Sequence, residues 1–396
     1  MFGTVQRVYL DHAATTSMLP EARAAWLEVS ERVGNASSLH TSGRAARRVV
    51  ESARESIAED LGIRPSAVIF TGGGTESDNL AVKGLYWARC SQLGKRPLTI
   101  VTSAIEHHAV LDPVMWLSEH EGAVVEFVST ERQGRVSVVD IESALTRGDV
   151  ALVSIMWANN EIGAIQPVHA IAELCKKFNV PFHTDAVQAL GQLHLGLGGL
   201  EATAVTISSH KIGGPVGVGA LIVDPYARFT PVMHGGGQER EIRSGTFDPA
   251  SIAAFAAAVH YAVSDLDEHA ARLRELQEYL ISAVRSAVPE VILNGPPPGE
   301  ARLPNNTHFS FPGCEGDSLL MLLDAAGIDC STGSACTAGI PEPSHVLLSM
   351  GVDEKTARAS LRFSLGRDSS KEGIDRLAQA LPGVVERAHR AGSVSV

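Results

Sequence analysis

The sequence predicts an α/β protein, with a mainly parallel seven-stranded sheet covered by helices and a smaller α+β domain attached to it. Short β-rich runs alternate with helix-period segments from about residue 65 to about residue 225. Several of these runs are apolar throughout, which is typical of strands that helices cover on both faces. After about residue 248 the alternation ends, and a long helical region at 249–288 leads into a Pro-rich stretch.

Seven short runs are the strand candidates, and each is separated from the next by a longer segment. They are AVIFT (67–71), LTIVTS (98–103), AVVEFVS (123–129), VALVSIMWA (150–158), VPFHTDA (180–186), AVTISS (204–209) and GALIVD (219–224). Helix-like stretches such as 108–122 and 168–179 lie between them. Strands that alternate with helices in this way favour a parallel sheet, because each crossover returns the chain to the same edge.

The C-terminal part of the chain has a different texture. Its elements are a Pro-rich stretch (294–304), a strand-like run (306–312), a helix (316–327), a second strand-like run (360–366) and a terminal helix. We expect a large domain at 17–248 and a small α+β domain made of 1–16 and 249–396. The small domain would carry a loop at about 329–342 that contains Cys336.

Composition indicates an ordinary globular protein. The 396 residues are 44% hydrophobic and 20% charged, with a formal net charge of −12. Such a charge is unsuited to following nucleic-acid phosphates, so we expect no direct nucleic-acid partner. The one basic run, GRAARR at 43–48, is interpreted as the solvated face of a helix.

The sequence also bears on the compartment. No apolar stretch approaches the ~20 residues of a membrane span, and the N-terminus lacks the pattern of a signal peptide. The five cysteines are scattered, with no Cys-x-x-Cys pair. We therefore expect a cytoplasmic protein with reduced thiols, no membrane contact and no intrinsic metal site.

Two reactive side chains come directly after or at the end of predicted strands. Lys211, in SSHKIGGP, precedes a glycine-rich turn, where its amine could form a Schiff base with a carbonyl such as that of pyridoxal phosphate (PLP). Asp185, in HTDA, ends a strand, where it could keep a pyridine nitrogen protonated. Each also has a plainer explanation: an exposed loop lysine, and an aspartate that caps the following segment.

Two glycine-rich stretches suggest binding of an anion. TGGGTESDN at 71–79 runs from a strand end into a helix, where free N–H groups stabilise phosphate, but it is neither a P-loop nor a dinucleotide fingerprint. HGGGQ at 234–238 is similar to the oxyanion loop of lipases. That interpretation is discounted, because the chain has no Gly-x-Ser-x-Gly nucleophile elbow.

Cys336 lies in STGSACTAG, among the smallest side chains available. A structural cysteine gains from apolar neighbours, whereas a reactive cysteine needs access and surroundings that favour the thiolate. This stretch by itself leaves both explanations open.

Together with these stretches, a longer set of motifs runs along nearly the whole chain. The set is YLDHAATT, GNASSLH, GGGTESDN, EHHAVL, NNEIG, HTDAVQ, SSHKIGGP, MHGGGQEREIRSGT, STGSACTAG and SLRFSLGR. In this order it resembles the cysteine desulfurases of the NifS/IscS type, which are class V aminotransferase-like enzymes that depend on PLP. The resemblance implies the type I fold of PLP-dependent transferases, and an enzyme that converts L-cysteine to L-alanine.

The resemblance assigns cofactor roles to residues of this chain. Lys211 matches the lysine that binds PLP covalently as an aldimine and later moves the substrate Cα proton. His107 matches the residue that stacks on the ring, and Asp185 matches the partner of the pyridine nitrogen. The remaining matches are Asn160 and Gln188 near the ring hydroxyl, and Gly74, Thr75, Ser208 and His210 around the phosphate.

The resemblance also assigns residues to the substrate, the sulfur and the assembly. Arg362 matches the arginine that binds the substrate carboxylate, assisted by Asn35. Cys336 matches the nucleophile that takes the sulfur as a persulfide. Thr246 matches a threonine that reaches the phosphate of the neighbouring subunit, which implies a homodimer.

The sulfur acceptor is expected to be another protein, either an iron–sulfur scaffold or a relay for thiolation of tRNA or cofactors. The chain ends at RAHRAGSVSV, without the longer tail by which some relatives hold the scaffold, so the acceptor stays open. His12 stands where many relatives have asparagine, which leaves the pocket entrance open. Whether Cys336 also ligates an iron–sulfur cluster transiently is open as well.

Three other functions compete with this one. A class V aminotransferase would need no cysteine in the loop, and a selenocysteine lyase would use similar residues. A non-catalytic scaffold with the same fold would not require Lys211, Asp185, His107 and Cys336 together, because packing alone does not demand that set.

Overall fold

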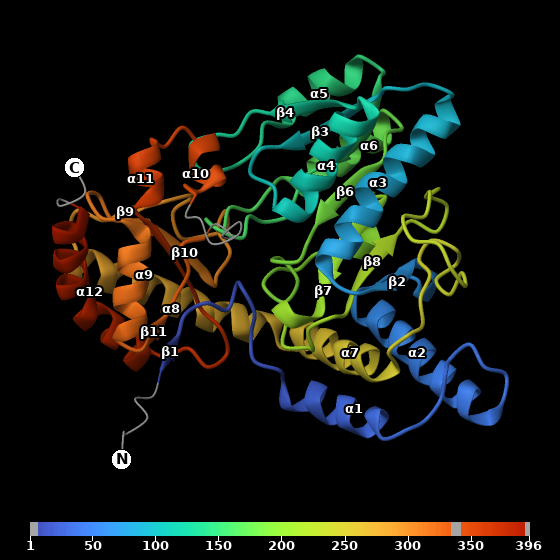
Figure 1. Ribbon diagram of the computed structural model, residues 1–396, viewed down its shortest axis with the longest axis horizontal. Helices are drawn as coiled ribbons and strands as arrows, with labels where there is room; N and C mark the ends of the chain where they lie inside the picture. Colours follow the sequence, from blue (N-terminus) through green and yellow to red (C-terminus); the bar gives the residue numbers. More distant parts are fainter. Residues whose placement is uncertain (1–6, 334–341, 393–396) are drawn as a thin grey trace.

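The computed structural model describes residues 7–333 and 342–392. Figure 1 shows two lobes, one built on a large sheet and the other on small sheets and helices. Cys336 and most of the loop predicted around it lie outside the described residues.

The large lobe is built on a seven-stranded sheet with strand order β2-β8-β7-β6-β5-β3-β4. The strands are β2 (Val68–Thr71), β3 (Thr99–Ser103), β4 (Val124–Val128), β5 (Val150–Ser154), β6 (Phe182–Asp185), β7 (Ala204–Ser208) and β8 (Gly219–Val223). β8 runs antiparallel to β2 and β7, while the other neighbouring pairs are parallel. The prediction of a mainly parallel seven-stranded sheet is confirmed.

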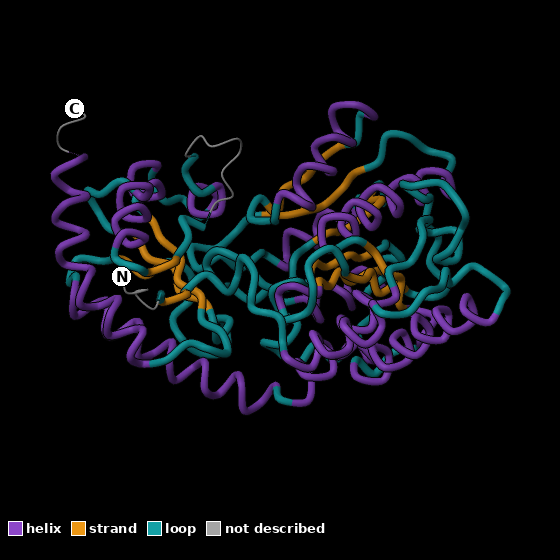
Figure 2. The backbone as a smooth tube through the Cα atoms, turned by 60° about the horizontal axis from the view of Figure 1, so that its bottom comes forward, coloured by secondary structure: helices purple, strands orange, loops and turns teal. Residues whose placement is uncertain are grey.

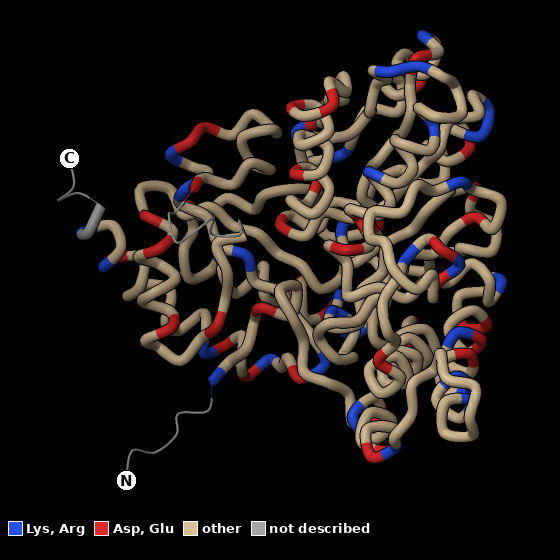
Figure 3. Tube along the Cα trace, turned by 45° about the vertical axis from the view of Figure 1, so that its right-hand side comes forward, with Lys and Arg blue, Asp and Glu red and all other residues tan. Residues whose placement is uncertain are grey.

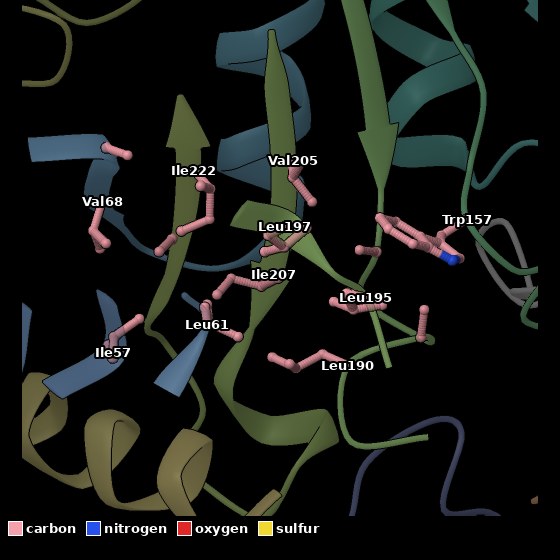
Figure 4. Packing of buried hydrophobic residues seen from close by; sticks show 14 of the residues in the cluster. Ile57, Leu61, Val68, Trp157, Leu190, Leu195, Leu197, Val205, Ile207 and Ile222 are labelled. Atoms are coloured by element: carbon pink, nitrogen blue, oxygen red, sulfur yellow. The ribbon is translucent and has the colours of Figure 1, made fainter. Parts of the chain in front are cut away.

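Helices cover both faces of this sheet. They are α1 (Pro20–Ser30), α2 (Thr41–Asp60), α3 (Gly74–Leu93), α4 (His108–Glu121), α5 (Val138–Thr146), α6 (Val168–Lys177) and α7 (Pro249–Ser264). Apolar residues of α3 and α4 form one buried cluster with one face of the sheet, and those of α2, α5, α6 and α7 form another with the opposite face. Figure 4 shows Val205, Ile207 and Ile222 of the sheet near Ile57 and Leu61 at the end of α2.

This double covering explains why several of the predicted strands are apolar throughout. In β2, Ile69 belongs to the cluster with α3 and α4, whereas Val68 and Phe70 belong to the cluster on the opposite face. Successive side chains of a strand point to opposite faces, so a sheet buried on both sides favours apolar residues at consecutive positions.

The small lobe contains β1 (Val8–Tyr9), α8 (Leu266–Ala287), β9 (Ile292–Leu293), β10 (Asn306–Ser310), α9 (Gly316–Ala325), β11 (Ile328–Asp329), α10 (His345–Ser349), α11 (Glu354–Arg358), β12 (Ser360–Ser364) and α12 (Lys371–Gly392). β10 lies between β12 and β9 in an antiparallel sheet, and β1 pairs with β11 in parallel. Figure 2 shows its strands as a group apart from those of the large sheet. A separate buried cluster joins α8, α9 and α12 to these strands.

α7 and α8 follow one another in Figure 1, where α7 lies above α1, and lead from the large lobe to the small one. α7 packs against α1 and α2, and its apolar residues belong to the core of the large lobe. The sequence of α7, PASIAAFAAAVHYAVS, is apolar on almost every side, which suits a helix buried between other elements. The predicted boundary of the two domains at residue 248 stays a prediction.

The basic run at 43–48 lies in α2, as expected for a solvated helix face. Arg44, Arg47 and Arg48 are exposed, and Arg47 pairs with Glu51 one turn further on, at 3.0 Å. Figure 3 shows Lys and Arg positions mixed with Asp and Glu positions along the chain. Within residues 7–333 and 342–392, no helix is long and apolar enough to cross a membrane, and no cluster of His, Cys, Asp and Glu suits a metal ion.

Candidate active site

A cavity of about 370 Å³ lies where the carboxyl ends of β6 and β7 meet the small lobe. Ligands bind at this edge in open α/β sheets. Many residues singled out in the sequence line it: Gly74, Thr75, His107, Asn160, Asp185, Gln188, Ser208, His210, Lys211 and Arg362. Motifs spread over almost three hundred positions of the sequence therefore converge on one site.

Lys211 could have been an exposed lysine in a loop, but its amine is held inside the site. It ends a short 3₁₀ turn that follows β7 directly, and its Nζ donates to the carbonyl oxygens of Ala13 at 2.7 Å and Ala14 at 2.6 Å. Burial, and next the Arg362 guanidinium, lowers the pKa of the amine to about 8. A neutral, nucleophilic amine is therefore accessible near neutral pH.

Asp185 is the last residue of β6 and is only 8% exposed. Its Oδ1 accepts a hydrogen bond from Val187 N at 2.8 Å, so the capping explanation holds for that oxygen. Burial, and next the nearby Asp78, raises the pKa of Asp185 to about 8. A carboxyl group held in so dry a place gains from a cationic partner such as a protonated pyridine nitrogen.

An anion cradle lies at the start of α3. The N-cap residue of this helix is Gly73, whose φ of +140° suits glycine and which has no side chain to bond the first N–H groups. A Cβ on Gly74 would lie 3.1 Å from Val187 Cγ2, so glycine keeps the backbone close to the cavity. Ser208 Oγ is buried without a hydrogen-bond partner among the described residues. These free donors suit a phosphate group.

His107 caps the N-terminus of α4, and its Nδ1 accepts a hydrogen bond from Ala109 N at 3.1 Å. This bond fixes the ring and leaves Nε2 to carry the proton of the neutral imidazole. Burial, and next the charge of Lys211, lowers the pKa of His107 to about 4. The ring is therefore neutral at pH 7 and can lie against another flat ring.

Arg362 lies on β12 and is 4% exposed. Its Nη1 donates to Asn160 O at 2.9 Å, and its Nη2 donates to Asp11 Oδ1 at 2.7 Å. Gln188, also at the cavity, donates from Nε2 to Ala13 O at 2.9 Å. A guanidinium has five N–H donors, so Arg362 keeps donors for a carboxylate.

Two of the expected residues do not line this cavity. Asn35 Oδ1 accepts a hydrogen bond from Ser37 N at 2.9 Å in the loop before α2, and Thr246 is exposed. His12 is 6% exposed and lines a neighbouring cavity of about 300 Å³, with its Nδ1 2.8 Å from Thr16 Oγ1. His12 therefore lines the neighbouring cavity, which shares Lys211 with the candidate active site, and is not part of the active-site lining itself.

Sequence reasoning missed several residues that line the cavity or pair with a residue of its lining. Asp78 lies one helical turn after Gly74, and this i, i+4 spacing could have indicated its position. Glu161 follows Asn160 directly. His345 and Asp11 have no local signal, because only the tertiary fold brings them to the site.

A lysine amine, a buried acid and an anion cradle at the carboxyl edge of a mainly parallel sheet define an α/β enzyme of the aminotransferase type. The sequence matches the family described as "Aminotransferase class-V" over residues 8–377. The chain therefore belongs to the class-V aminotransferase family of PLP-dependent enzymes and, within it, to the cysteine desulfurases of the IscS/NifS type.

Relatives with names and structures support this membership. An "IscS-like cysteine desulfurase" of Mycobacterium tuberculosis is 56% identical over 384 residues, which is 97% of each chain. A solved "NifS-like protein" has a TM-score of 0.88 and 35% identity, over 96% of this chain and all of the other. The structure described as "SspA in complex with cysteine" has a TM-score of 0.76 and 30% identity, over 90% and 98% of the two chains.

The residues present fit PLP. The unpartnered Ser208 Oγ and the uncapped start of α3 suit its phosphate, and the buried Asp185 suits its pyridine nitrogen. Lys211 brings an amine of lowered pKa to the same cavity. The start of α3 is more than a hundred positions from Asp185, Ser208 and Lys211 in the sequence, and the fold brings all of them to one cavity.

Proposed function

We propose that this cysteine desulfurase converts L-cysteine to L-alanine and passes the sulfur through a persulfide on Cys336 to an acceptor protein. One observation carries the proposal: Lys211, Asp185 and Arg362 share a cavity whose wall includes Ser331 and Gly333. These two residues come just before the segment that contains Cys336. The related SspA structure, which is a complex with cysteine, supports the substrate.

We assign the residues of the cavity to the parts of PLP that they would hold. Lys211 Nζ would hold PLP covalently, Asp185 would keep its ring nitrogen protonated, and His107 would lie against the ring. Bound in this way, PLP supplies an electron sink for the bond at the substrate Cα. Asn160 and Gln188 would face the ring hydroxyl. The phosphate would be held by Gly74, Thr75, Ser208 and His210.

The substrate would be oriented by its carboxylate, which Arg362 binds through its remaining N–H donors. Lys211 Nζ would then take the Cα proton, since its lowered pKa makes the neutral amine available. The Cys336 thiolate would attack the substrate sulfur. The new S–S bond forms as the Cβ–S bond breaks, and a proton finally replaces sulfur on Cβ to give alanine.

The experiment that tests this function is a single-turnover reaction of the PLP-bound enzyme with L-cysteine. We expect one alanine for each sulfur found as persulfide or sulfide, and a peptide containing Cys336 that is heavier by one sulfur atom. Amino-group exchange with a keto acid, without sulfur release, would instead identify an aminotransferase. Faster turnover of selenocysteine than of cysteine would identify a selenocysteine lyase.

The fate of the sulfur belongs to the same proposal. Relatives named IscS support supply to iron–sulfur cluster assembly, and we propose a scaffold protein or a thiolation relay in the cytoplasm as the acceptor. A transient role of Cys336 as a cluster ligand would be seen as iron-dependent absorption during transfer to a scaffold.

We propose a homodimer in which Thr246 of each chain reaches the phosphate of its neighbour. Thr246 is exposed and lies outside its own cavity, on a loop that Glu239 and Arg243 tie to α2 and α3 by ion pairs of 2.7 Å. Replacing Thr246 by alanine should weaken PLP binding roughly tenfold, because a hydrogen bond to an ionised group is lost.

The dimer prediction is checked by sedimentation of the enzyme and by titration of PLP into each variant. The matched control is Thr146→Ala, which removes an exposed hydroxyl at the end of α5 and should leave PLP binding unchanged. A fully active monomer, or equal PLP affinity in the Thr246 variant and the parent, would contradict the proposal.

A further inference from the structure

A short N-terminal segment contacts both cationic side chains of the active-site cavity. Asp11 Oδ1 accepts a hydrogen bond from Arg362 Nη2 at 2.7 Å, in an ion pair whose Arg362 and Asp11 side chains are 5% and 20% exposed. A few residues further on, the carbonyl oxygens of Ala13 and Ala14 accept hydrogen bonds from Lys211 Nζ. The segment is therefore placed to influence both groups at once.

The fold fixes Asp11 firmly beside β12. Leu10 N donates to Asp329 O at 2.9 Å, and Ser364 N donates to Leu10 O at 2.8 Å. Asp11 itself forms an isolated parallel bridge with Ser364, two positions along the strand from Arg362. A carboxylate held by backbone pairing on two sides loses little freedom when it pairs with the guanidinium.

The hydrogen bonds of Arg362 leave a defined set of donors free. Nη2 is directed to Asp11 and Nη1 to Asn160 O, while Nε has no partner among the described residues. Asp11 contacts Arg362 but is not itself part of the cavity lining. Two fixed acceptors determine the plane of the guanidinium, and a bidentate contact with a substrate carboxylate depends on that plane.

Asp11 also counteracts the effect of the Arg362 charge on the pKa of Lys211. Burial lowers the pKa of Lys211 most, the charge of Arg362 lowers it next, and Asp11 and Asp185 act in the opposite direction. Without the Asp11 charge, Arg362 would act on Lys211 with only Asp185 to offset it. The local environment would then favour the neutral amine more strongly.

We propose that Asp11 is the positioning residue of the substrate-carboxylate site, which sets the plane of Arg362 and balances its charge beside Lys211. This inference rests on the proposed role of Arg362 in binding the substrate. It assigns Asp11 no contact with substrate or cofactor.

Steady-state kinetics of the PLP-bound enzyme test whether Asp11 sets the plane of Arg362. Asp11→Ala should raise the KM for L-cysteine roughly tenfold and change kcat less than about threefold, because a charge-assisted hydrogen bond that orients Arg362 is lost. Asp11→Asn keeps an oxygen acceptor and should recover most of the loss in KM. An unchanged KM in Asp11→Ala overturns the inference, as does an equal rise in KM in the Asn variant.

A labelling experiment that needs no turnover tests whether Asp11 balances the charge of Arg362 beside Lys211. In the full-length chain freed of PLP, the rate at which an amine-reactive reagent modifies Lys211 is followed against pH by mass spectrometry. Asp11→Asn should shift the midpoint to lower pH. The matched control is Asp329→Asn, whose carboxylate pairs with Arg7 at the surface and which should leave the midpoint in place. A midpoint that Asp11→Asn does not move overturns the inference.

A third variant separates this inference from the proposed function. If Arg362→Lys leaves the KM for cysteine unchanged, Arg362 does not bind the carboxylate and the proposed function fails on that point. The labelling midpoint still reports on Asp11 in that case. If Arg362→Lys raises KM while Asp11→Ala does not, the function stands and the inference about Asp11 fails.

Discussion

Replacing Cys336 by serine should leave PLP and L-cysteine binding intact and reduce sulfide release at least about a thousandfold, with no persulfide on the protein. A thiolate attacks sulfur readily, whereas a serine hydroxyl at neutral pH is neither ionised nor able to form a comparable bond to sulfur. Visible spectroscopy measures the binding of cysteine to the PLP enzyme. Alanine and sulfide assays measure the loss of turnover.

Cys330 provides the matched control, because it lies close to Cys336 in the sequence. It packs against the core of the small lobe, and burial raises the pKa of its thiol well above the usual range. Cys330 is half-buried, and Cys90, Cys175 and Cys314 are buried. Cys330→Ser should therefore keep nearly normal turnover. Normal turnover of Cys336→Ser, with loss in Cys330→Ser, would show that the wrong cysteine had been assigned.

Replacing Lys211 by alanine should abolish the visible absorption of the enzyme-bound cofactor and reduce turnover by roughly 10³–10⁴-fold, because both the anchoring amine and the base for the Cα proton are lost. The parent amine is held by the carbonyls of Ala13 and Ala14, so its position is defined before any ligand arrives. Absorption spectra and alanine formation measure the two effects.

Lys177→Ala is a suitable control for this variant. Lys177 is exposed on α6 and pairs with Glu142 at 3.2 Å, so its loss should change neither the spectrum nor turnover. An unaltered spectrum in Lys211→Ala would rule out Lys211 as the residue that holds PLP.

Much of the fold could be predicted from local patterns, because those patterns reflect burial on two faces. Val68, Ile69 and Phe70 are all buried, although they alternate between the two helical layers. The same logic placed Asp185 and Lys211 correctly, since each lies at the carboxyl end of such a strand or just beyond it. Helical packing of α7 against α1 and α2 was not evident, because an all-round apolar helix does not show which neighbours bury it.

The parts of the site that escaped prediction depend on long-range contacts. Asp11 and Arg362 are 351 positions apart, and no spacing rule connects them. His345 reaches the cavity only because α10 docks there, where its Nε2 lies 2.9 Å from Glu106 O. Local patterns identify the reactive side chains at strand ends. The residues that orient those side chains or change their pKa reach the site only through the packing of the two lobes.

The pairing of β1 with β11 has a consequence for the order of assembly during synthesis. Val8 pairs with Ile328, so β1 leaves the ribosome about 320 residues before its partner strand. At ~5–20 residues per second, roughly 15–60 s of translation separate the two. The large sheet, from Val68 to Val223, is complete well before that time. The segment that places Asp11, Ala13 and Ala14 at the active site is therefore made before the large sheet, but it can pair with β11 and β12 only after they have been made. The cavity can be completed only once the small lobe has been synthesised.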